Sequence, residues 1–196
     1  MDIKFHCNTE DNFTNTHQQV RAFLFTDYSI EPHNHDFYEI NIVLKGRGTH
    51  QMENARFGVK TGDVFIIPPM TVHSYYDTKE LDVYHILLKK NFILDNQKEA
   101  AGIPCFLQLV EIEPFLRQHF SNEMFLHLSN NQLMQLKSDL SFIEDNGVFD
   151  TSELMPLKNH TTWKIIYWFS SLLFKQMYRG DEKSLKNYDI EIIRIL

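Results

Sequence analysis

Cysteine is scarce in this sequence, with Cys7 and Cys105 the only two among 196 residues. Two cysteines cannot build the disulfide framework of a small secreted protein, and they fit a reducing environment. No apolar run approaches the roughly 18 residues that a membrane span requires. The N-terminal stretch MDIKFHCNTEDNF also lacks the apolar segment of a secretion signal. We therefore expect a cytoplasmic protein without a membrane segment.

Positive charge is also in short supply, since 19 Lys and Arg stand against 26 Asp and Glu, for a net charge of −7. A chain this acidic is a poor nucleic-acid binder on its own, because phosphate binding needs a basic surface. Seven glycines, six prolines and 43% hydrophobic residues exclude a collagen-like or disordered chain. Aromatic residues are abundant, with 16 Phe and 8 Tyr, which favours sheets and aromatic-lined interiors.

Short apolar or alternating runs fill residues 20–93 and predict strands. Turn signals separate them, among them Gly46-Arg47-Gly48, Thr61-Gly62-Asp63 and Asp77. This pattern is typical of an antiparallel barrel or sandwich. The predicted strands are residues 20–25, 37–46, 48–53, 56–60, 63–69, 72–76, 81–88 and a last one at 105–112, with a polar loop at 94–104.

From about residue 129 the apolar period becomes helical. Ser129 can cap a first helix, whose apolar positions 133, 136, 140 and 143 share one face and which Gly147 can end. A second helix is predicted over residues 159–178, and a third begins near Ser184. The third keeps its apolar period up to Leu196 without a stop signal, so we expect a fragment that ends inside a helix.

Histidines mark the most informative part of the sequence. In one strand, His33, His35 and Glu39 would share a face, because side chains alternate along a strand. His73 would join them from another strand. Neutral imidazoles and a carboxylate suit a divalent ion such as Zn, Fe, Mn, Ni or Cu. They suit a polar organic ligand, or a purely structural network, equally well.

The spacing of these residues resembles the two motifs of the cupin barrel family. His33-x-His35-x3-Glu39-x6-Gly46 resembles the first motif, and Gly62-x5-Pro68-x4-His73 resembles the second. Two departures stand in the second motif, where Met70 replaces the usual glycine and Asp77 the usual asparagine. The resemblance implies a cupin-type barrel, a double-stranded β-helix or jelly roll, and it implies metal less firmly than it implies the fold.

A narrower resemblance covers residues 20–196. The stretches HNHDFYEINIVLKGRGTH, VKTGDVFIIPPMTVHSYY, LDVYHILL and FLHLSNNQ resemble the sensor domain of AraC-family bacterial transcription regulators. That likeness implies an N-terminal arm at 1–19, a sensor barrel at 20–127 and dimerisation helices at 128–180. It further implies that 181–196 begin a linker to a helix-turn-helix domain that is absent from this chain and would bind DNA.

The fold expected is therefore mainly β with a helical annex, and the function expected is ligand sensing without catalysis. The ligand, a sugar by family resemblance, would contact His33, His35, Phe37, Glu39, His73 and Tyr75. A homodimer seam would use Trp163, Ile166, Tyr167, Ser170, Phe174 and Met177. His50 and His85 are interpreted as structural.

Two other functions stay open. A small metal-dependent cupin enzyme, such as a dioxygenase or a sugar isomerase, would use His33, His35, Glu39 and His73 as metal ligands. A stand-alone cupin would only bind or store its ligand. The predicted helices after the barrel and the lack of a separate acid–base pair favour the regulator.

Overall fold

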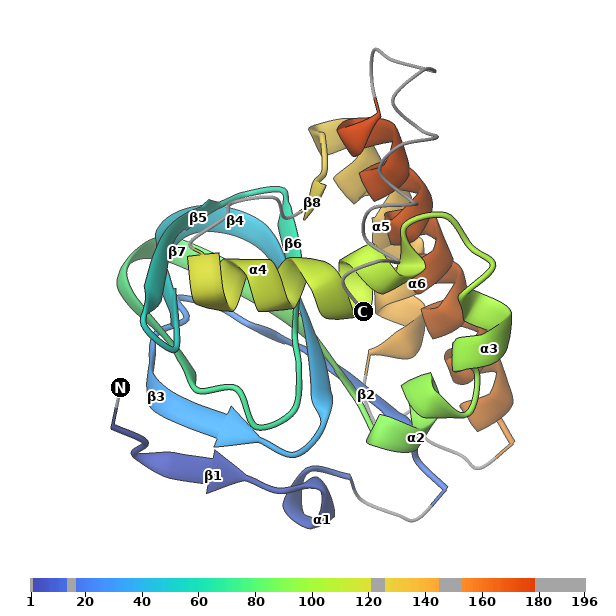
Figure 1. The fold of residues 1–196 in the computed structure, drawn as a ribbon, viewed down its shortest axis with the longest axis horizontal. Helices are drawn as coiled ribbons and strands as arrows, with labels where there is room; N and C mark the ends of the chain where they lie inside the picture. Colours follow the sequence, from blue (N-terminus) through green and yellow to red (C-terminus); the bar gives the residue numbers. More distant parts are fainter. Residues whose placement is uncertain (1, 14–16, 121–125, 145–152, 179–196) are drawn as a thin grey trace.

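A computed structural model describes residues 2–13, 17–120, 126–144 and 153–178 of the chain. Within these residues eight strands form one strongly curved sheet, which closes as a barrel beside a group of helices (Figure 1). The strands are β1 (Phe5–Cys7), β2 (Val20–Phe25), β3 (Ile30–His35), β4 (Tyr38–Met52), β5 (Ala55–Lys60), β6 (Asp63–Ile67), β7 (His73–Leu88) and β8 (Leu126–His127).

The long strands β4 and β7 are the frame of the barrel. They pair antiparallel from Tyr38 opposite Leu88 to Met52 opposite His73. The sequence predicted a break in each, at residue 47 and at residues 77–80, and the structure instead continues both strands through shifts of register. Gly46 makes this possible, because its φ of +78° is left-handed and an added Cβ would lie 2.1 Å from the carbonyl oxygen of Glu80.

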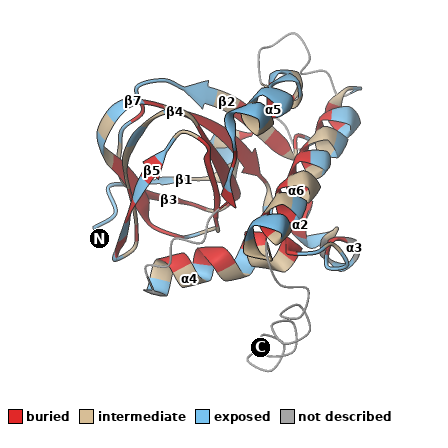
Figure 2. Cartoon of the chain, turned by 90° about the horizontal axis from the view of Figure 1, so that it is seen from above, coloured by how far each residue is buried: buried red, intermediate tan, exposed pale blue. Residues whose placement is uncertain are grey.

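Two hydrophobic cores lie on opposite faces of this sheet, as alternation of side chains requires. Val43, Phe65, Tyr75 and Val83 belong to the inner core, which fills the barrel. Their strand neighbours Ile40, Ile42, Val64, Ile66 and Tyr84 point outward to the core shared with the helices. Figure 2 shows the resulting buried layer where the barrel wall meets the helices.

The segment after β7 is helical, which corrects two predictions. The expected loop at 94–104 holds the end of α2 (Lys90–Leu94) and α3 (Gln97–Ala100). The expected strand at 105–112 is wrong, since it contains a π-helical turn, η1 (Gln108–Ile112), that runs into α4 (Glu113–Phe120). A short apolar run does not distinguish a buried helix from a strand by its period. Pro114 is the second residue of α4, at the junction with η1.

Helices α5 (Asn130–Ile143) and α6 (Met155–Met177) form the predicted annex. Ser129 caps α5 in a reciprocal box with Gln132, as the sequence predicted. The predicted start of α6 at residue 159 is one turn late. The helix begins at Met155, with Pro156 in its first turn, a position that tolerates proline. The predicted third helix, the linker and Gly147 lie outside the described residues. The fold class predicted, a cupin-type barrel with a helical annex, is confirmed.

The N-terminal residues also contribute structure. β1 pairs in parallel with β3, so that Phe5 lies opposite His33, and α1 (Thr9–Asn12) follows it along the same side of the barrel (Figure 1). Among the described helices none is long and apolar enough to span a membrane.

Candidate functional site

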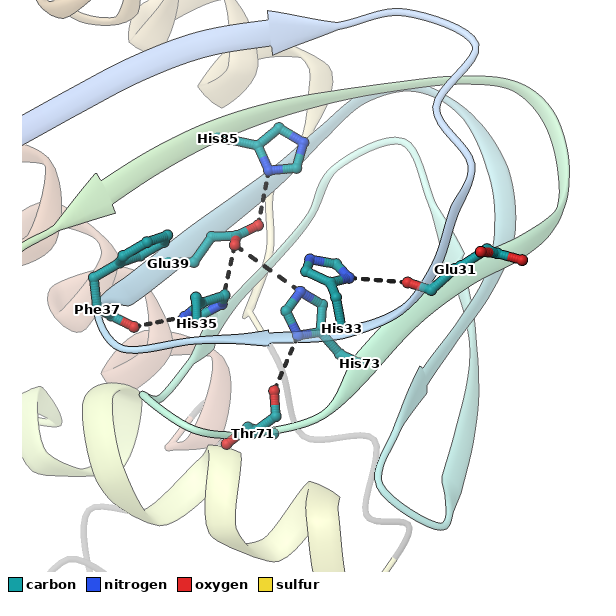
Figure 3. Close-up of polar contacts among 8 residues, drawn as sticks. All are labelled: Glu31, His33, His35, Phe37, Glu39, Thr71, His73 and His85. Atoms are coloured by element: carbon teal, nitrogen blue, oxygen red, sulfur yellow. Dashed lines mark hydrogen bonds and ion pairs between the residues drawn. The ribbon is translucent and has the colours of Figure 1, made fainter. Parts of the chain in front are cut away.

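Glu39 and four histidines form a buried cluster inside the barrel (Figure 3). His33 and His35 come from the end of β3, Glu39 from the start of β4, and His73 and His85 from the two halves of β7. The sequence placed residues 33–39 on one strand, and this is wrong: a turn at Asp36 and Phe37 separates β3 from β4. The predicted side chains converge nonetheless, because the turn returns the chain to the same face.

Glu39 is held from two sides by histidines. His85 Nδ1 donates to Oε1 at 2.8 Å. On the other side Oε2 lies 3.1 Å from Nε2 of His35 and 3.9 Å from Nε2 of His73. Burial alone would raise the pKa of Glu39, but the hydrogen bonds and charges of His35 and His85 hold it well below its ordinary value. The site therefore contains a buried carboxylate that stays ionised.

Three of these histidines belong to the two cupin motifs, and the Nδ1 atom of each is hydrogen-bonded to a backbone carbonyl oxygen. Nδ1 of His33, His35 and His73 lies 3.0, 2.7 and 3.2 Å from the carbonyl oxygens of Glu31, Phe37 and Thr71. A carbonyl can only accept, so each Nδ1 carries a proton. His33 and His73 present a lone pair at Nε2, whereas Nε2 of His35 faces Oε2 of Glu39. Metal-binding histidines are oriented in the same way.

Nε2 of His35 is the ring atom that faces the ionised carboxylate. It lies 3.1 Å from Oε2 of Glu39, and a contact this short needs a positive group between the two atoms, because two acceptors would repel each other. A proton on Nε2 or a divalent cation provides that positive group. Ligand atoms of His35, Glu39 and His73 all lie within 4.8 Å of one another, so the donor set fits a metal ion.

His33 does not join that group. Its ring stacks on Phe5 with centroids 4.9 Å apart and lies tilted against His73 with centroids 4.2 Å apart. Of the four predicted metal ligands the structure thus brings three together and leaves His33 beside them. Burial lowers the pKa of His33, and it lowers that of His73 well below the ordinary value, so these rings stay neutral as metal or ligand contacts require.

The two predicted aromatic wall residues behave differently. Tyr75 lies in the barrel interior, where it stacks on His50 with ring centroids 4.5 Å apart. Phe37 lies in the turn before β4, stacks on His35 at 4.5 Å and packs against Phe13. Phe37 therefore supports His35 from the side of the N-terminal residues.

His85 and His50, which the sequence indicates as structural histidines, lie inside the barrel. His85 is the firmest partner of Glu39, and His50 is fully buried. His85 shares the inward phase of Val83 and Leu87 in its strand. Its contact with Glu39 was not predicted, because the pairing of β7 with β4, which sets Asn41 opposite His85, is not readable from spacing.

The two departures from the second motif have a backbone explanation. Met70 has φ of +67° and Asp77 has φ of +51°, the left-handed region that glycine and asparagine adopt easily. Met70 still donates its N–H to the carbonyl oxygen of His35 at 2.6 Å. Both replaced positions therefore have the left-handed backbone that glycine and asparagine favour.

The predicted dimer seam on α6 divides into two sets. Ile166 and Ser170 are fully buried within the protomer itself, which contradicts a direct role for them between subunits. Trp163, Tyr167, Phe174 and Met177 are partly buried against the core, and Trp163 stacks on Phe92 at 5.0 Å. Apolar residues on several sides of α6 pack within the chain. Only the four partly buried residues of the predicted seam therefore keep surface that is exposed.

The sequence matches the family described as the AraC-like ligand binding domain over residues 21–141. The chain belongs to this family. Its similarity to curated proteins points the same way. It is 32% identical over 84 residues to the HTH-type transcriptional activator RhaR of Pectobacterium atrosepticum, covering 42% of this chain and 30% of the relative. It is 28% identical over 99 residues to RhaR of Escherichia coli K12, covering 50% of this chain and 35% of the relative.

Solved structures resemble the barrel over a smaller part. KdgF from Halomonas sp. is 20% identical, with a TM-score of 0.35, over 37% of this chain and 72% of that one. A cupin superfamily protein from Desulfitobacterium hafniense is 16% identical, with a TM-score of 0.34, over 37% and 69%. The matched part of the chain spans about a third of the length of its curated relatives. The predicted membership in the AraC-like family is confirmed.

Proposed function

We propose that this chain is the ligand-sensing and dimerising part of a cytoplasmic transcription regulator of the AraC type. In this proposal a small molecule binds inside the barrel, and a helix-turn-helix domain elsewhere in the full protein binds DNA. Binding would favour one arrangement of the barrel and helices over another and so change the affinity for DNA. Membership in a ligand-binding family and the names of the curated relatives support this assignment.

One observation in the barrel carries the ligand part of the proposal. Nε2 of His73 and of His85 have no hydrogen-bond partner among the described residues, although both rings are buried. A buried polar atom without a partner costs about 1–3 kcal/mol. A ligand that formed hydrogen bonds with several such atoms would recover this cost, which supports binding inside the barrel. Nε2 of His73 and the carboxylate of Glu39 suit the hydroxyl groups of a sugar-like effector, or a divalent ion that such an effector could share.

The N-terminal residues are the proposed gate of this site. Phe5 covers His33 by stacking, and His6 Nδ1 donates to Oδ1 of Asn34 at 2.7 Å. Thr9 Oγ1 donates to Asp36 at 2.6 Å. These contacts join residues 5–9 to the strand and turn that carry His33 and His35. A ligand that moved either histidine would therefore change the contacts that hold the N-terminal residues on the barrel.

Dimerisation is proposed through the partly exposed residues of α6. Phe174→Glu, at a position half-buried in the protomer, should lower the mass of the protein in light scattering from a dimer to a monomer. Lys175→Glu, exposed on the same helix, is the matched control and should leave the mass unchanged. Unchanged mass for a folded Phe174→Glu protein would contradict this seam.

A metal-dependent enzyme is the second candidate, favoured by the close set of His35, Glu39 and His73. These residues would hold the ion, which would supply Lewis-acid chemistry. The chain's own contribution would be the ionised Glu39 and the fixed tautomers of His35 and His73. Stoichiometric metal in the purified protein, together with turnover of a cupin substrate, would favour this candidate over the sensor.

The sensor proposal is tested by a thermal-shift screen of a metabolite library against the 196-residue chain. A ligand that binds only the native state raises the melting temperature in proportion to the logarithm of its concentration over Kd. We expect at least one compound to do so in wild type and to lose its effect in His73→Ala. The same compound should change operator affinity of the full-length regulator. A library without any stabilising compound would refute ligand sensing in the barrel.

A further inference from the structure

A second polar group lies inside the barrel wall, away from Glu39, and centres on Arg117 of α4. Arg117 is the largest fully buried side chain among the described residues, with 1% of its surface exposed. Its guanidinium carbon lies 4.7 Å from the ring centroid of Phe65, which belongs to the inner core. Helix α4 thus extends a permanent cation through the wall toward the interior.

Three contacts fix one edge of the guanidinium. Nε lies 2.9 Å from Oε1 of Glu113, and Nη2 donates to Oε2 of Glu113 at 3.2 Å. Nη2 also donates to the carbonyl oxygen of Ile66 at 2.6 Å. Nη1, which carries two N–H donors, has no hydrogen-bond partner among residues of the described segments. The guanidinium is therefore held in one orientation, and its Nη1 can donate hydrogen bonds to a ligand.

His50 belongs to the same group. It is fully buried, it stacks on Phe65 and Tyr75, and neither of its ring nitrogens has a hydrogen-bond partner in the described part of the chain. Burial and the charge of Arg117 lower its pKa well below the ordinary value, so the ring is neutral with one donor and one acceptor. Its centroid lies 5.9 Å from that of His73, which connects this group to the Glu39 site.

The charges at this end of the barrel sum to zero. Burial raises the pKa of Glu113, while the charge and hydrogen bond of Arg117 oppose that rise. As an ion pair at 2.9 Å, Glu113 and Arg117 carry no net charge, and His50 is neutral. A carboxylate entering here would bring an unpaired negative charge into a low-dielectric interior that already holds Glu39, which is costly. A hydroxyl or carbonyl oxygen would accept from Nη1 without that cost, and a hydroxyl could also donate to His50.

We propose that Arg117 and His50 form a second subsite, which binds an uncharged oxygen of the barrel ligand and, through Glu113, rejects a carboxylate at that position. Arg117 is the contact residue, and Glu113 sets the charge selection. The inference rests on the proposed function, because it describes the far end of the same ligand site. It narrows the ligand to an uncharged, oxygen-bearing compound rather than an acid.

Matched pairs of probes test the subsite by calorimetry and thermal shift on the 196-residue chain. D-Galactose with D-galacturonate, and D-glucose with D-glucuronate, differ only in a hydroxymethyl group against a carboxylate. We expect the uncharged member of at least one pair to bind wild type tenfold or more tightly than its acid. In Glu113→Gln the acid should gain tenfold or more while the uncharged sugar changes less than threefold, because the arginine charge is no longer cancelled.

Asp139→Asn is the control, since Asp139 pairs with Lys164 on the exposed faces of α5 and α6 and should leave both preferences unchanged. Arg117→Lys, which keeps the charge and loses the fork, should weaken the uncharged sugar. Circular dichroism confirms that each variant is folded, and a crystal of the wild-type complex should show the sugar oxygen at Nη1.

The inference is overturned if the acids bind wild type as tightly as their partners, if Glu113→Gln leaves the preference unchanged, or if neither member of any pair binds. An ordered water at Nη1 that no probe displaces would overturn it too. These outcomes are distinct from failure of the sensor proposal, in which the metabolite screen itself yields no ligand. A screen hit that depends on His73 but prefers acids would retain the sensor and remove this subsite.

Discussion

His50 makes the stability of the protein depend on pH in a way that can be calculated. Burial and the nearby Arg117 lower its pKa in the folded state well below the ordinary value of 6.5. The unfolded chain therefore takes up a proton as pH falls below 6.5, while the folded chain does not. This contribution to stability is fully present above pH 6.5 and is lost as pH falls toward the folded pKa.

The size of the effect follows from linkage. If the folded ring stays neutral at pH 5.5, moving from pH 7.5 to 5.5 costs about 1.4 kcal/mol of unfolding free energy for this one histidine. His50→Phe removes the titration and keeps a planar ring on Phe65 and Tyr75. The variant should lose about 1.4 kcal/mol less than wild type over the same interval, since the other titrating groups are common to both proteins.

Urea denaturation of metal-free protein at pH 7.5, 6.5 and 5.5, followed by tryptophan fluorescence, measures the difference. The slopes with urea must stay equal for the comparison to hold. Equal losses in wild type and variant, within about 0.4 kcal/mol, would mean that His50 titrates in the folded protein as it does in the unfolded chain. That result would refute the description of its nitrogens as buried and neutral.

Three further changes probe the site and the fold. Glu39→Gln should cost about 1 kcal/mol at neutral pH, because the charge-assisted hydrogen bond from His85 becomes a neutral one; an unchanged urea midpoint would contradict the ionised carboxylate. Ser129→Ala should cost about 1 kcal/mol through loss of the α5 cap, whereas Ser141→Ala, exposed in the same helix, should cost nothing; equal losses would deny the cap. Gly46→Ala should cost more than about 3 kcal/mol or prevent folding, since its Cβ would meet the backbone of Glu80. Gly58→Ala should be tolerated, because apart from the chain neighbours no atom of the described residues lies within 4 Å of the added Cβ. Urea midpoints of variant and control measure each difference.

Local patterns in the sequence predicted what local physics determines. Alternation located most strands, and the capping residue Ser129 located the start of α5. The pair of motifs located His35, Glu39 and His73, because their spacing is tied to the turns between strands. The helical segment after β7 escaped prediction, because a run such as residues 108–112 is equally apolar as helix or strand, and only its packing decides.

The parts of the site that escaped prediction are those that depend on distant pairing. His85 reaches Glu39 from 46 positions away, and Arg117 reaches Ile66 from 51 positions away. Neither belongs to a motif, and a buried arginine on a short helix reads from sequence as a solvated charge. Register between β4 and β7, rather than residue type, determines which polar side chains share the interior.

The pairing of β2 with β7 bears on how this chain folds. Val20 lies opposite Leu88 and Phe25 opposite Val83, so closing the barrel joins segments that are nearly seventy residues apart at one end. Closure of such long loops slows folding, because their entropy is lost before the contacts form. Helices α5 and α6 are local and can form early, whereas the histidines around Glu39 assemble only after both long strands have paired. During refolding, the helical circular dichroism signal should therefore recover before ligand binding does. Ligand binding should recover at the rate at which the last strands pair.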